Sequence, residues 1–373
     1  DVYIEANTLL EEQPALVAQV TETFRHLEEQ RGDEIALWKE TRAWSIDYLK
    51  QVYNELDLTI DHWYFESEVI AKTKKIIEGL IKQGIVKQSE GAWIVDLKEQ
   101  DLGVNLLIKT DGTLLYNAKD LGLAMKKEDD YHPTRSIYVV DERQSHALKQ
   151  LFATLKRMGF ERELQHLSYE FVTLEGGAMA ARKGNVIRYE DLRDELLGEA
   201  RRETKSRHED WSKKKIEKVV RAVAFAALRF SMLKQDNGKK IVFNLKEAVS
   251  FEGFTGPYLL YTYARIQSLL KKAGRKKAKA TTATLTHPTE HQLVFLLAKY
   301  PEIVFDTAQT LAPSMLAQFL FDLAKTFAEF YAQVPVLTKE GPDLSERLAL
   351  VRAVGTVLAQ GLELLGIDLI DEM

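Results

Sequence analysis

The sequence of 373 residues contains no cysteine, which excludes a disulfide framework and a thiolate metal site. No apolar run approaches the ~20 residues that a membrane-spanning helix needs, and residues 1–13 lack the basic and apolar segments of a signal peptide. These absences favour a cytoplasmic protein. Because 45% of the residues are hydrophobic, the chain can bury a large core, and its length predicts two or three domains.

The net charge of −5 excludes a protein that is basic over its whole surface, but the charge is unevenly distributed along the chain. Residues 201–280 contain 21 Lys and Arg against seven Asp and Glu, an excess of +14, so the remainder carries −19. A basic segment on an acidic protein predicts a local polyanion site, since each phosphate contacted by Lys or Arg releases counterions. The alternative for the lysine-rich run 271–279 is a solvated linker.

The first 205 residues alternate between helical and strand patterns, which is typical of an α/β domain. The run Ser136–Glu142 is apolar and β-branched, like a buried parallel strand, and polar residues follow it where a doubly wound sheet binds ligands. The order of strand, helix, strand and loop matches the second half of a Rossmann-type fold. Predicted helices span 1–30, 34–54, 68–83, 146–158 and 190–201, and predicted strands span 58–65, 92–97, 104–110, 136–142 and 167–173.

Residues 206–373 consist of long helical patterns and predict a second, all-α domain. Leu316, Leu320 and Leu323, for example, recur with the helical period and indicate a bundle. The predicted helices span 214–232, 246–273, 289–299, 301–310, 313–333 and 342–365.

The run LEGGAMAARKGNVI, Leu174 to Ile187, combines glycines with two adjacent cations. Glycine lets the main chain approach an anion closely, and Arg182 and Lys183 can neutralise charge that develops as pyrophosphate leaves an α-phosphate. The run therefore predicts a triphosphate site. The alternative is a basic surface turn.

Four ordered segments resemble arginyl-tRNA synthetases of class I. The run just described resembles the loop that this family carries in place of KMSKS, and GPYLLYTYARI at 256–266 resembles a helix of the same family. The other two are DGTLLYNAKDLGLA at 111–124 and SIYVVDERQSHALKQLFATLKRMGF at 136–160. The likeness extends over essentially the whole chain, to a C-terminus at Met373 that matches the family's.

One family feature is missing from these 373 residues. Class I synthetases bind ATP with a His-x-Gly-His motif, which none of the eight histidines forms, and the chain begins at Asp1 without an initiator Met. We therefore expect the C-terminal portion of such an enzyme, without the N-terminal domain and the first half of the nucleotide-binding fold.

The resemblance implies a fold, an activity and partners. The expected fold is a partial Rossmann-type catalytic domain at 1–205 followed by a helical, DALR-type anticodon-binding domain at 206–373. The implied activity is ATP-dependent activation of arginine and its transfer to tRNA(Arg), with Mg²⁺ accompanying ATP, although this chain alone is expected to be inactive. The implied partners are tRNA(Arg), arginine and ATP, with no membrane and no protein-held metal, and the chain is expected to be monomeric.

The resemblance also implies an arginine site. In the family, a Tyr-x-x-x-Asp pair and a Gln about two dozen residues later line this site, and Tyr116, Asp120 and Gln144 match that pattern. Asp120 is assigned to the guanidinium, and Tyr116 and Gln144 to orienting the substrate. The alternative for a Tyr/Asp pair at helical spacing is an ordinary amphipathic surface.

The catalytic residues implied by the resemblance are Arg182 and Lys183, but their loop departs from the family pattern. Alanines stand where KMSKS has its two lysines and where its usual serine lies, so Arg182 and Lys183 are expected to carry the charge stabilisation. The three alanines are Ala178, Ala180 and Ala181, and the implied ATP-binding residues are Gly177, Met179, Arg182 and Lys183.

Tyr258, Tyr261 and Arg265 are candidates for RNA contact, because aromatic rings and a guanidinium can stack on unpaired anticodon bases. The alternative is that the tyrosines belong to the core of the bundle. Two further functions stay open: a non-catalytic module that binds tRNA or a protein partner, and a different class I nucleotidyl transferase. The arginine-site pattern argues against the transferase, whereas the missing histidine motif and the alanines keep the module open.

Overall fold

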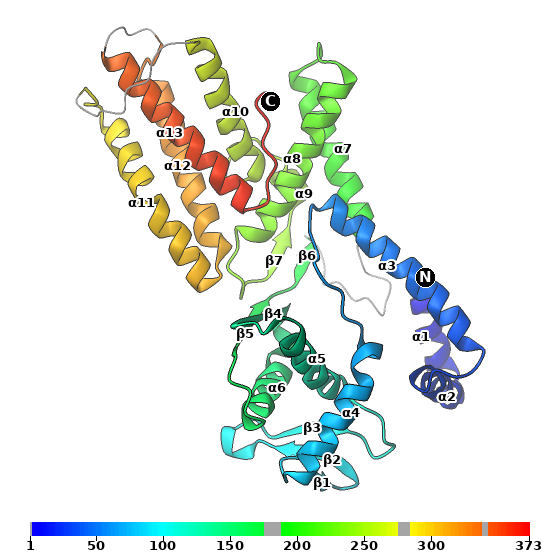
Figure 1. Cartoon of the computed structure of the whole chain (residues 1–373). Helices are drawn as coiled ribbons and strands as arrows, with labels where there is room; N and C mark the ends of the chain where they lie inside the picture. The colour runs from blue at the N-terminus through cyan, green and yellow to red at the C-terminus, as the bar shows by residue number, and fades with distance from the viewer. Residues whose placement is uncertain (1, 175–187, 275–283, 338–341) are drawn as a thin grey trace. The chain divides into compact units, whose positions relative to one another are not determined.

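The computed structural model describes residues 2–174, 188–274, 284–337 and 342–373. The chain divides into two compact units, Asp1–Glu170 and Phe171–Met373, whose elements are labelled in Figure 1. The first unit combines helices with strands and the second is mostly helical, which confirms the predicted fold class. Across the described ranges, no helix is both long enough and apolar enough to cross a membrane.

The first unit begins with three helices, α1 (Val2–Glu12), α2 (Leu16–Glu28) and α3 (Glu34–Glu55), in segments predicted to be helical. Although α2 packs on α3, none of the described side chains of these helices is buried. The helical period therefore predicted the helices correctly, while many of their apolar side chains stay exposed. The large ones are Val2, Tyr3, Leu9, Val17, Val20, Phe24, Leu37, Trp44, Tyr48 and Leu49.

The strand predicted at 58–65 is wrong, because this segment has no regular structure. Its aromatic side chains contact other side chains instead of lying beside a neighbouring strand. The ring centres of Trp63 and Tyr53 are 5.7 Å apart, and the Arg42 guanidinium lies 3.9 Å from the centre of the Phe65 ring. Alternating apolar residues do not form a strand without a partner for the backbone hydrogen bonds.

The centre of the first unit is built from α4 (Glu66–Lys82), α5 (Tyr116–Tyr131) and a three-stranded antiparallel sheet. The helices approach closely at Gly122, where a Cβ atom would lie 2.0 Å from Thr73 Oγ1. Ile77, Leu107 and Leu121 are fully buried between the sheet and the helices. The strands, in sheet order, are β1 (Lys87–Ser89), β2 (Ala92–Asp96) and β3 (Val104–Ile108), and a short helix, η1 (Lys98–Gln100), follows β2.

The predicted strand–helix–strand unit is present. Strand β4 (Arg135–Asp141) leads through η2 (Glu142–Gln144) and α6 (Ser145–Arg157) to β5 (Glu163–Tyr169). The two strands are parallel, which requires a crossover connection such as α6. Helix α6 buries its leucines, Leu148, Leu151 and Leu155, in the core of the unit.

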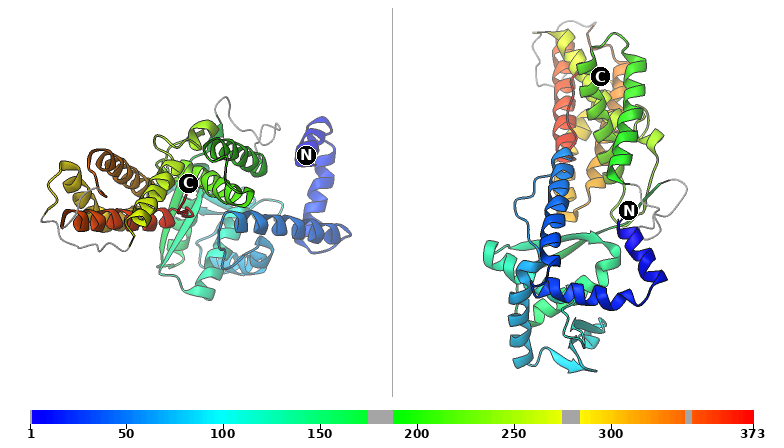
Figure 2. Two further views of the ribbon diagram at one scale, coloured as in Figure 1. Left: turned by 90° about the horizontal axis from the view of Figure 1, so that it is seen from above. Right: turned by 90° about the vertical axis from the view of Figure 1, so that its right-hand side faces the viewer.

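The second unit is a helical bundle with one small parallel sheet. Helices α8 and α10 to α13 lie side by side in both figures and share one core that includes Phe230, Phe327 and Phe330 (Figures 1 and 2). The elements are β6 (Val172–Leu174), α7 (Tyr189–Arg207), α8 (Lys213–Leu233), β7 (Ile241–Phe243), α9 (Leu245–Ala248), α10 (Gly256–Ala273), α11 (Pro288–Thr310), α12 (Pro313–Gln333) and α13 (Pro342–Leu364).

The helix predicted at 246–273 is interrupted: α9 ends at Ala248 and α10 begins at Gly256. Thr255 caps α10, because its Oγ1 accepts a hydrogen bond from the Tyr258 N–H at 3.2 Å. Gly256 allows α10 to pack against α8, since a Cβ atom there would lie 2.3 Å from the carbonyl oxygen of Ala226.

The two helices predicted at 289–299 and 301–310 are one continuous helix, α11, with Pro301 inside it. Proline removes one hydrogen-bond donor and disfavours a helix interior. Packing of α11 along α12 and α13 offsets this cost, so proline here does not end the helix.

Candidate functional site

Helix α5, which carries two of the predicted site residues, is fixed by a chain of buried hydrogen bonds. Asn117 Nδ2 donates to Asn105 Oδ1 on β3 at 3.1 Å, and Asn105 Nδ2 donates to Thr154 Oγ1 on α6 at 3.0 Å. The Thr154 hydroxyl in turn donates to the carbonyl of Gln150 at 2.7 Å. Since Asn105 and Thr154 are fully buried, the network holds the first turn of α5 in one position.

The structure places the three residues predicted for arginine on two neighbouring elements. Tyr116 is the exposed first residue of α5, Asp120 lies one turn later and is half-buried, and Gln144 is exposed at the end of η2. Within the described ranges, no side-chain hydrogen bond or ion pair joins Asp120 to Tyr116 or Gln144. Their convergence on one ligand remains a prediction.

Asp120 lies in surroundings that disfavour its negative charge. Burial raises the pKa of Asp120 to about 6, the nearby Glu66 carboxylate raises it as well, and Lys127 opposes the shift. Glu66 is itself paired with Lys119, whose Nζ lies 2.9 Å from Glu66 Oε2. A half-buried carboxylate that none of the described side chains binds directly is suited to accept an external cation.

Tyr138 and Lys127 lie close to Asp120. The Lys127 ammonium is 4.1 Å from the centre of the Tyr138 ring, and burial lowers the pKa of Lys127. Burial and the Asp120 charge raise the pKa of Tyr138 to about 12, and its buried hydroxyl has no hydrogen-bond partner among the described residues.

The sequence analysis did not identify Glu66, Lys127 or Tyr138. Lys127 lies seven residues after Asp120 and thus on the same helical face, a spacing that could have revealed it. Glu66 and Tyr138 come from α4 and β4, and only the fold brings them near Asp120.

The residues predicted to bind ATP and to catalyse the reaction, Gly177, Met179, Arg182 and Lys183, lie outside the described residues. In the parts of the chain that are described, no group of three or more His, Asp and Glu side chains could hold a metal ion.

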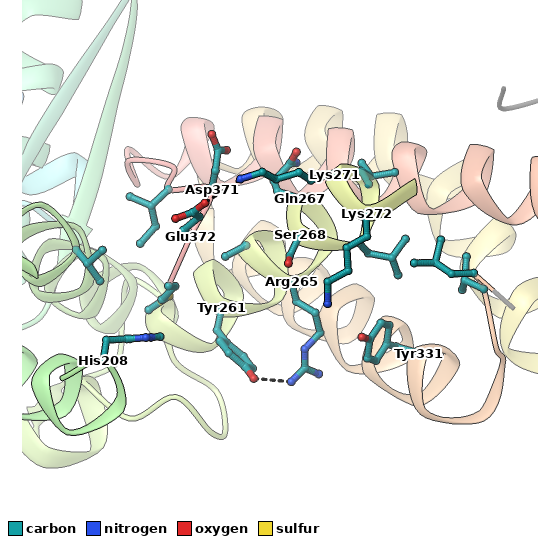
Figure 3. A pocket seen from close by; sticks show the side chains of 18 of the residues that line it. His208, Tyr261, Arg265, Gln267, Ser268, Lys271, Lys272, Tyr331, Asp371 and Glu372 are labelled. Atoms are coloured by element: carbon teal, nitrogen blue, oxygen red, sulfur yellow. Dashed lines mark hydrogen bonds and ion pairs between the residues drawn. The ribbon is translucent and has the colours of Figure 1, made fainter. Parts of the chain in front are cut away.

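The second unit contains a groove of about 1200 Å³ that combines positive charge with aromatic rings (Figure 3). Its lining comes from the α7–α8 turn, the first turns of α8, α10, the end of α12 with residues 334–337, and the C-terminal segment 370–373. Such a combination is typical of surfaces that bind single-stranded nucleic acid. The cationic residues are Lys215, Lys218, Arg265, Lys271 and Lys272, and the aromatic residues are Trp211, Tyr261 and Tyr331.

Two of the three residues predicted to contact RNA line this groove. Arg265 Nη2 donates to Tyr261 Oη at 2.6 Å, and the guanidinium lies 4.6 Å and 5.3 Å from the ring centres of Tyr261 and Tyr331 (Figure 3). Tyr258 does not line the groove. Its ring centre lies 5.7 Å from that of Phe321, and burial raises its pKa.

A second aromatic stack lies at the α7–α8 turn. The rings of His208 and Trp211 are 3.7 Å apart and nearly parallel, and Lys215 Nζ lies 3.8 Å from the centre of the Trp211 ring. Lys215 and Lys271 also pair with Glu372, at 2.5 Å and 3.1 Å. Glu372, one of three acidic residues that line the groove, therefore neutralises part of its positive charge.

Comparison with protein families matches almost the whole chain. Residues 1–245 match the family described as tRNA synthetases class I (R), catalytic domain, and residues 259–373 match the DALR anticodon binding domain. The chain is 38% identical over its whole length to an arginine–tRNA ligase of Bdellovibrio bacteriovorus and 35% identical to one of Streptococcus uberis. It spans 66% of the length of each relative.

Solved structures show the same similarity. The arginyl-tRNA synthetase of Thermus thermophilus superposes with a TM-score of 0.84 and 28% identity, covering 97% of this chain and 68% of that one. The Plasmodium falciparum enzyme gives 0.81 with 21% identity, over 94% of this chain and 61% of that one, and at this identity it supports the fold alone.

Proposed function

We propose, because this chain belongs to the arginine-type class I tRNA synthetases, that it is part of an arginine–tRNA ligase. In this proposal the first unit binds arginine and the second binds tRNA(Arg). The domain boundary at 205/206 is also a proposal; the matched families end at 245 and begin at 259, and the compact units divide after Glu170.

The proposed arginine site is supported mainly by the surroundings of Asp120, which hold its carboxylate in place and disfavour its negative charge. A guanidinium requires a fixed carboxylate, and Asp120 is half-buried on a helix fixed by buried hydrogen bonds, with its pKa raised to about 6. Tyr116 and Gln144 would orient the rest of the substrate. The nearby Glu66 carboxylate adds negative potential that favours a cation.

The proposed chemistry needs no side-chain nucleophile. A carboxylate oxygen of arginine attacks the α-phosphate of Mg²⁺-bound ATP and pyrophosphate leaves; a terminal ribose hydroxyl of tRNA then attacks the arginyl carbonyl and AMP leaves. Arg182 and Lys183 would neutralise the developing phosphate charge, beside Gly177 and Met179. Because the 373 residues contain no His-x-Gly-His, we expect this chain alone to make no arginyl-adenylate, and arginine-dependent ATP–pyrophosphate exchange by it would contradict this.

Arginine binding can be tested by calorimetric titration of the chain. We expect binding at about pH 8 that weakens as the pH falls through about 6, because a protonated Asp120 cannot pair with guanidinium. Asp120→Asn should abolish it. The control, Asp130→Asn, removes an exposed carboxylate of the same helix and should leave binding intact. Equal affinity in Asp120→Asn and the unmodified chain would refute the assignment.

For the second unit we propose that tRNA(Arg) binds in the groove through Tyr261 and Arg265, with Tyr258 supporting α10 from the core side. The supporting observation is a guanidinium held beside two rings among several lysines. Binding should weaken steeply with salt, and Arg265→Ala should raise the Kd about tenfold. Arg352→Ala, an exposed arginine outside the groove, is the control. Binding that does not respond to salt would reject the proposal.

The second candidate function is a non-catalytic tRNA-binding module. The alanines at 178, 180 and 181 favour it, because they remove two cations and a hydroxyl from the loop that would bind ATP. The arginine titration separates the two candidates. Salt-sensitive tRNA binding without arginine binding favours the module, whereas binding of both favours the ligase.

A further inference from the structure

A polar network in the first unit connects the turn that carries Gln144 to the neighbouring strand β5. His166 on β5 places its Nε2 3.1 Å from the carbonyl oxygen of Val140 on β4, and its Nδ1 3.2 Å from Ser145 Oγ on α6. Because a carbonyl oxygen only accepts, Nε2 carries a proton and donates it to Val140. The ring is therefore held at both nitrogens, and its Nδ1 contacts the residue that directly follows Gln144.

The same face of β5 also contacts the turn ahead of Gln144. Hydrogen bonds from Ser168 and Ser145 lower the pKa of Glu142. His166 and Ser168 are two residues apart on β5, so their side chains lie on one face of the strand. This face thus contacts the turn both before and after Gln144.

A local pair closes the turn on itself. Asp141 accepts hydrogen bonds from the backbone N–H and the guanidinium of Arg143, each at 3.0 Å. The side chain of Arg143 is 70% exposed, so this pair contributes little stability. It sets the shape of η2, whereas the half-buried network of His166 sets the position of the turn beside β5.

The direction of the Gln144 side chain depends on this turn. Gln144 is the N-cap residue of α6, with φ −90° and ψ −2°, and its side chain makes no capping hydrogen bond. Its amide can therefore serve a ligand, and it points where the backbone on either side of it directs. An amide that orients a substrate has to be held in place by neighbouring contacts.

We propose that His166 is a positioning residue of the arginine site, because through Ser145 it holds the turn that presents the Gln144 amide to the substrate. The inference rests on the proposed binding of arginine by Asp120 and Gln144, and it extends that site to β5. His166 itself does not touch arginine in this arrangement. A change at His166 should therefore affect arginine binding only while Gln144 is present.

Calorimetric titration with arginine at about pH 8 tests two substitutions that each keep one contact of the ring. In His166→Asn the amide takes the place of Nδ1 and still reaches Ser145, whereas in His166→Gln it takes the place of Nε2 and reaches Val140 instead. We expect His166→Gln to raise the Kd about three- to tenfold and His166→Asn to retain most of the affinity. A purely structural role would weaken both variants alike, since each loses one hydrogen bond. The control, His146→Gln, changes an exposed histidine of α6 and should leave the Kd unchanged.

A double-mutant cycle shows whether His166 acts through Gln144. Gln144→Ala should raise the Kd for arginine about tenfold. Adding His166→Gln should then cause no further loss, because no amide is left to position. Losses that multiply in the double variant would overturn the inference.

The outcomes separate this inference from the proposed function. If arginine binds and Asp120→Asn abolishes binding, but His166→Gln binds as tightly as His166→Asn, the inference fails and the arginine site stands. If the unmodified chain does not bind arginine, both fail. If the His166 variants do not fold, Ser145→Ala removes the same contact from the other side. Unchanged affinity in Ser145→Ala would overturn the inference, and a loss that disappears in the Gln144→Ala background would support it.

Discussion

Two carboxylates, one in each compact unit, differ in the partners that the fold supplies. In the second unit, Glu290 is fully buried; its Oε1 accepts from Arg347 Nε at 2.6 Å and its Oε2 from the N–H groups of Thr286 and His287 at 2.9 Å. In the first unit, Asp120 is half-buried and, within the described ranges, no side chain pairs with it directly.

The difference separates a structural carboxylate from one available for binding. Burial disfavours the charge of both groups. Glu290 is compensated inside the fold, where it joins the segment before α11 to Arg347 on α13. Asp120 keeps an unfavourable charge at neutral pH, which a bound cation would compensate.

Arg347→Met should have the largest effect on stability. The change leaves Glu290 buried without its cation, and breaking a buried pair from one side costs about 3–5 kcal/mol of unfolding free energy. Urea denaturation followed by circular dichroism measures the loss. Arg352→Met, an exposed position on the same helix, should be nearly neutral. If Arg347→Met and Arg352→Met had the same free energy of unfolding, Glu290 would not depend on its internal cation. The distinction between Glu290 and Asp120 would then be lost.

Asp120→Asn should change stability in the opposite direction. The folded-state pKa of about 6 lies above the ordinary value of 3.8, so the folded protein binds this proton more tightly than the unfolded chain does. Stability is therefore lost as the pH rises from about 4 to about 6. At about pH 8 the Asn variant should be more stable by about 1–2 kcal/mol, and near pH 4 the gain should disappear.

Asp130→Asn is the matched control for the direction of this stability change. Hydrogen bonds from Tyr64 and Lys126 lower the pKa of Asp130, so its contribution is present above the ordinary value and is lost on acidification. This variant should be less stable than the unmodified chain at neutral pH. If Asp120→Asn also lost stability there, Asp120 would have a structural role like that of Glu290.

Glu372→Gln should have the smallest effect on stability, because this carboxylate is exposed and its pairs with Lys215 and Lys271 are at the surface. Thermal unfolding should be unchanged. The lysines become free for phosphate, so tRNA affinity should rise about two- to threefold and its salt dependence should steepen. Weaker tRNA binding in this variant would show that Glu372 organises the groove rather than competing with RNA.

Most of the helices could be predicted because their apolar residues repeat with the helical period. The helix at Pro313–Gln333 agrees with its prediction at both ends. The errors lie where contacts between distant segments overrule local sequence preferences. Pro301 stays inside α11, and the loop before Gly256 divides a predicted helix. The segment 58–65 has no partner strand. These outcomes depend on neighbouring elements, which periodicity does not describe.

The candidate site was predictable to the same extent. Spacing placed Tyr116 with Asp120, and Tyr261 with Arg265, on helical faces. It could not distinguish Tyr258, which packs in the core, from Tyr261, which reaches the groove. The orientation of each turn depends on which helices pack around α10.

The sequence by itself determined the family, the βαβ unit, the helical second half and the basic segment, because motifs, periodicity and charge are local properties of the chain. The tertiary structure alone decided which charges are compensated and which are not. Glu290 meets Arg347 across 57 residues, and Asp120 lies near Glu66 and Tyr138. Burial and distance set the energy of a charge or a hydroxyl, and only the packed fold defines them.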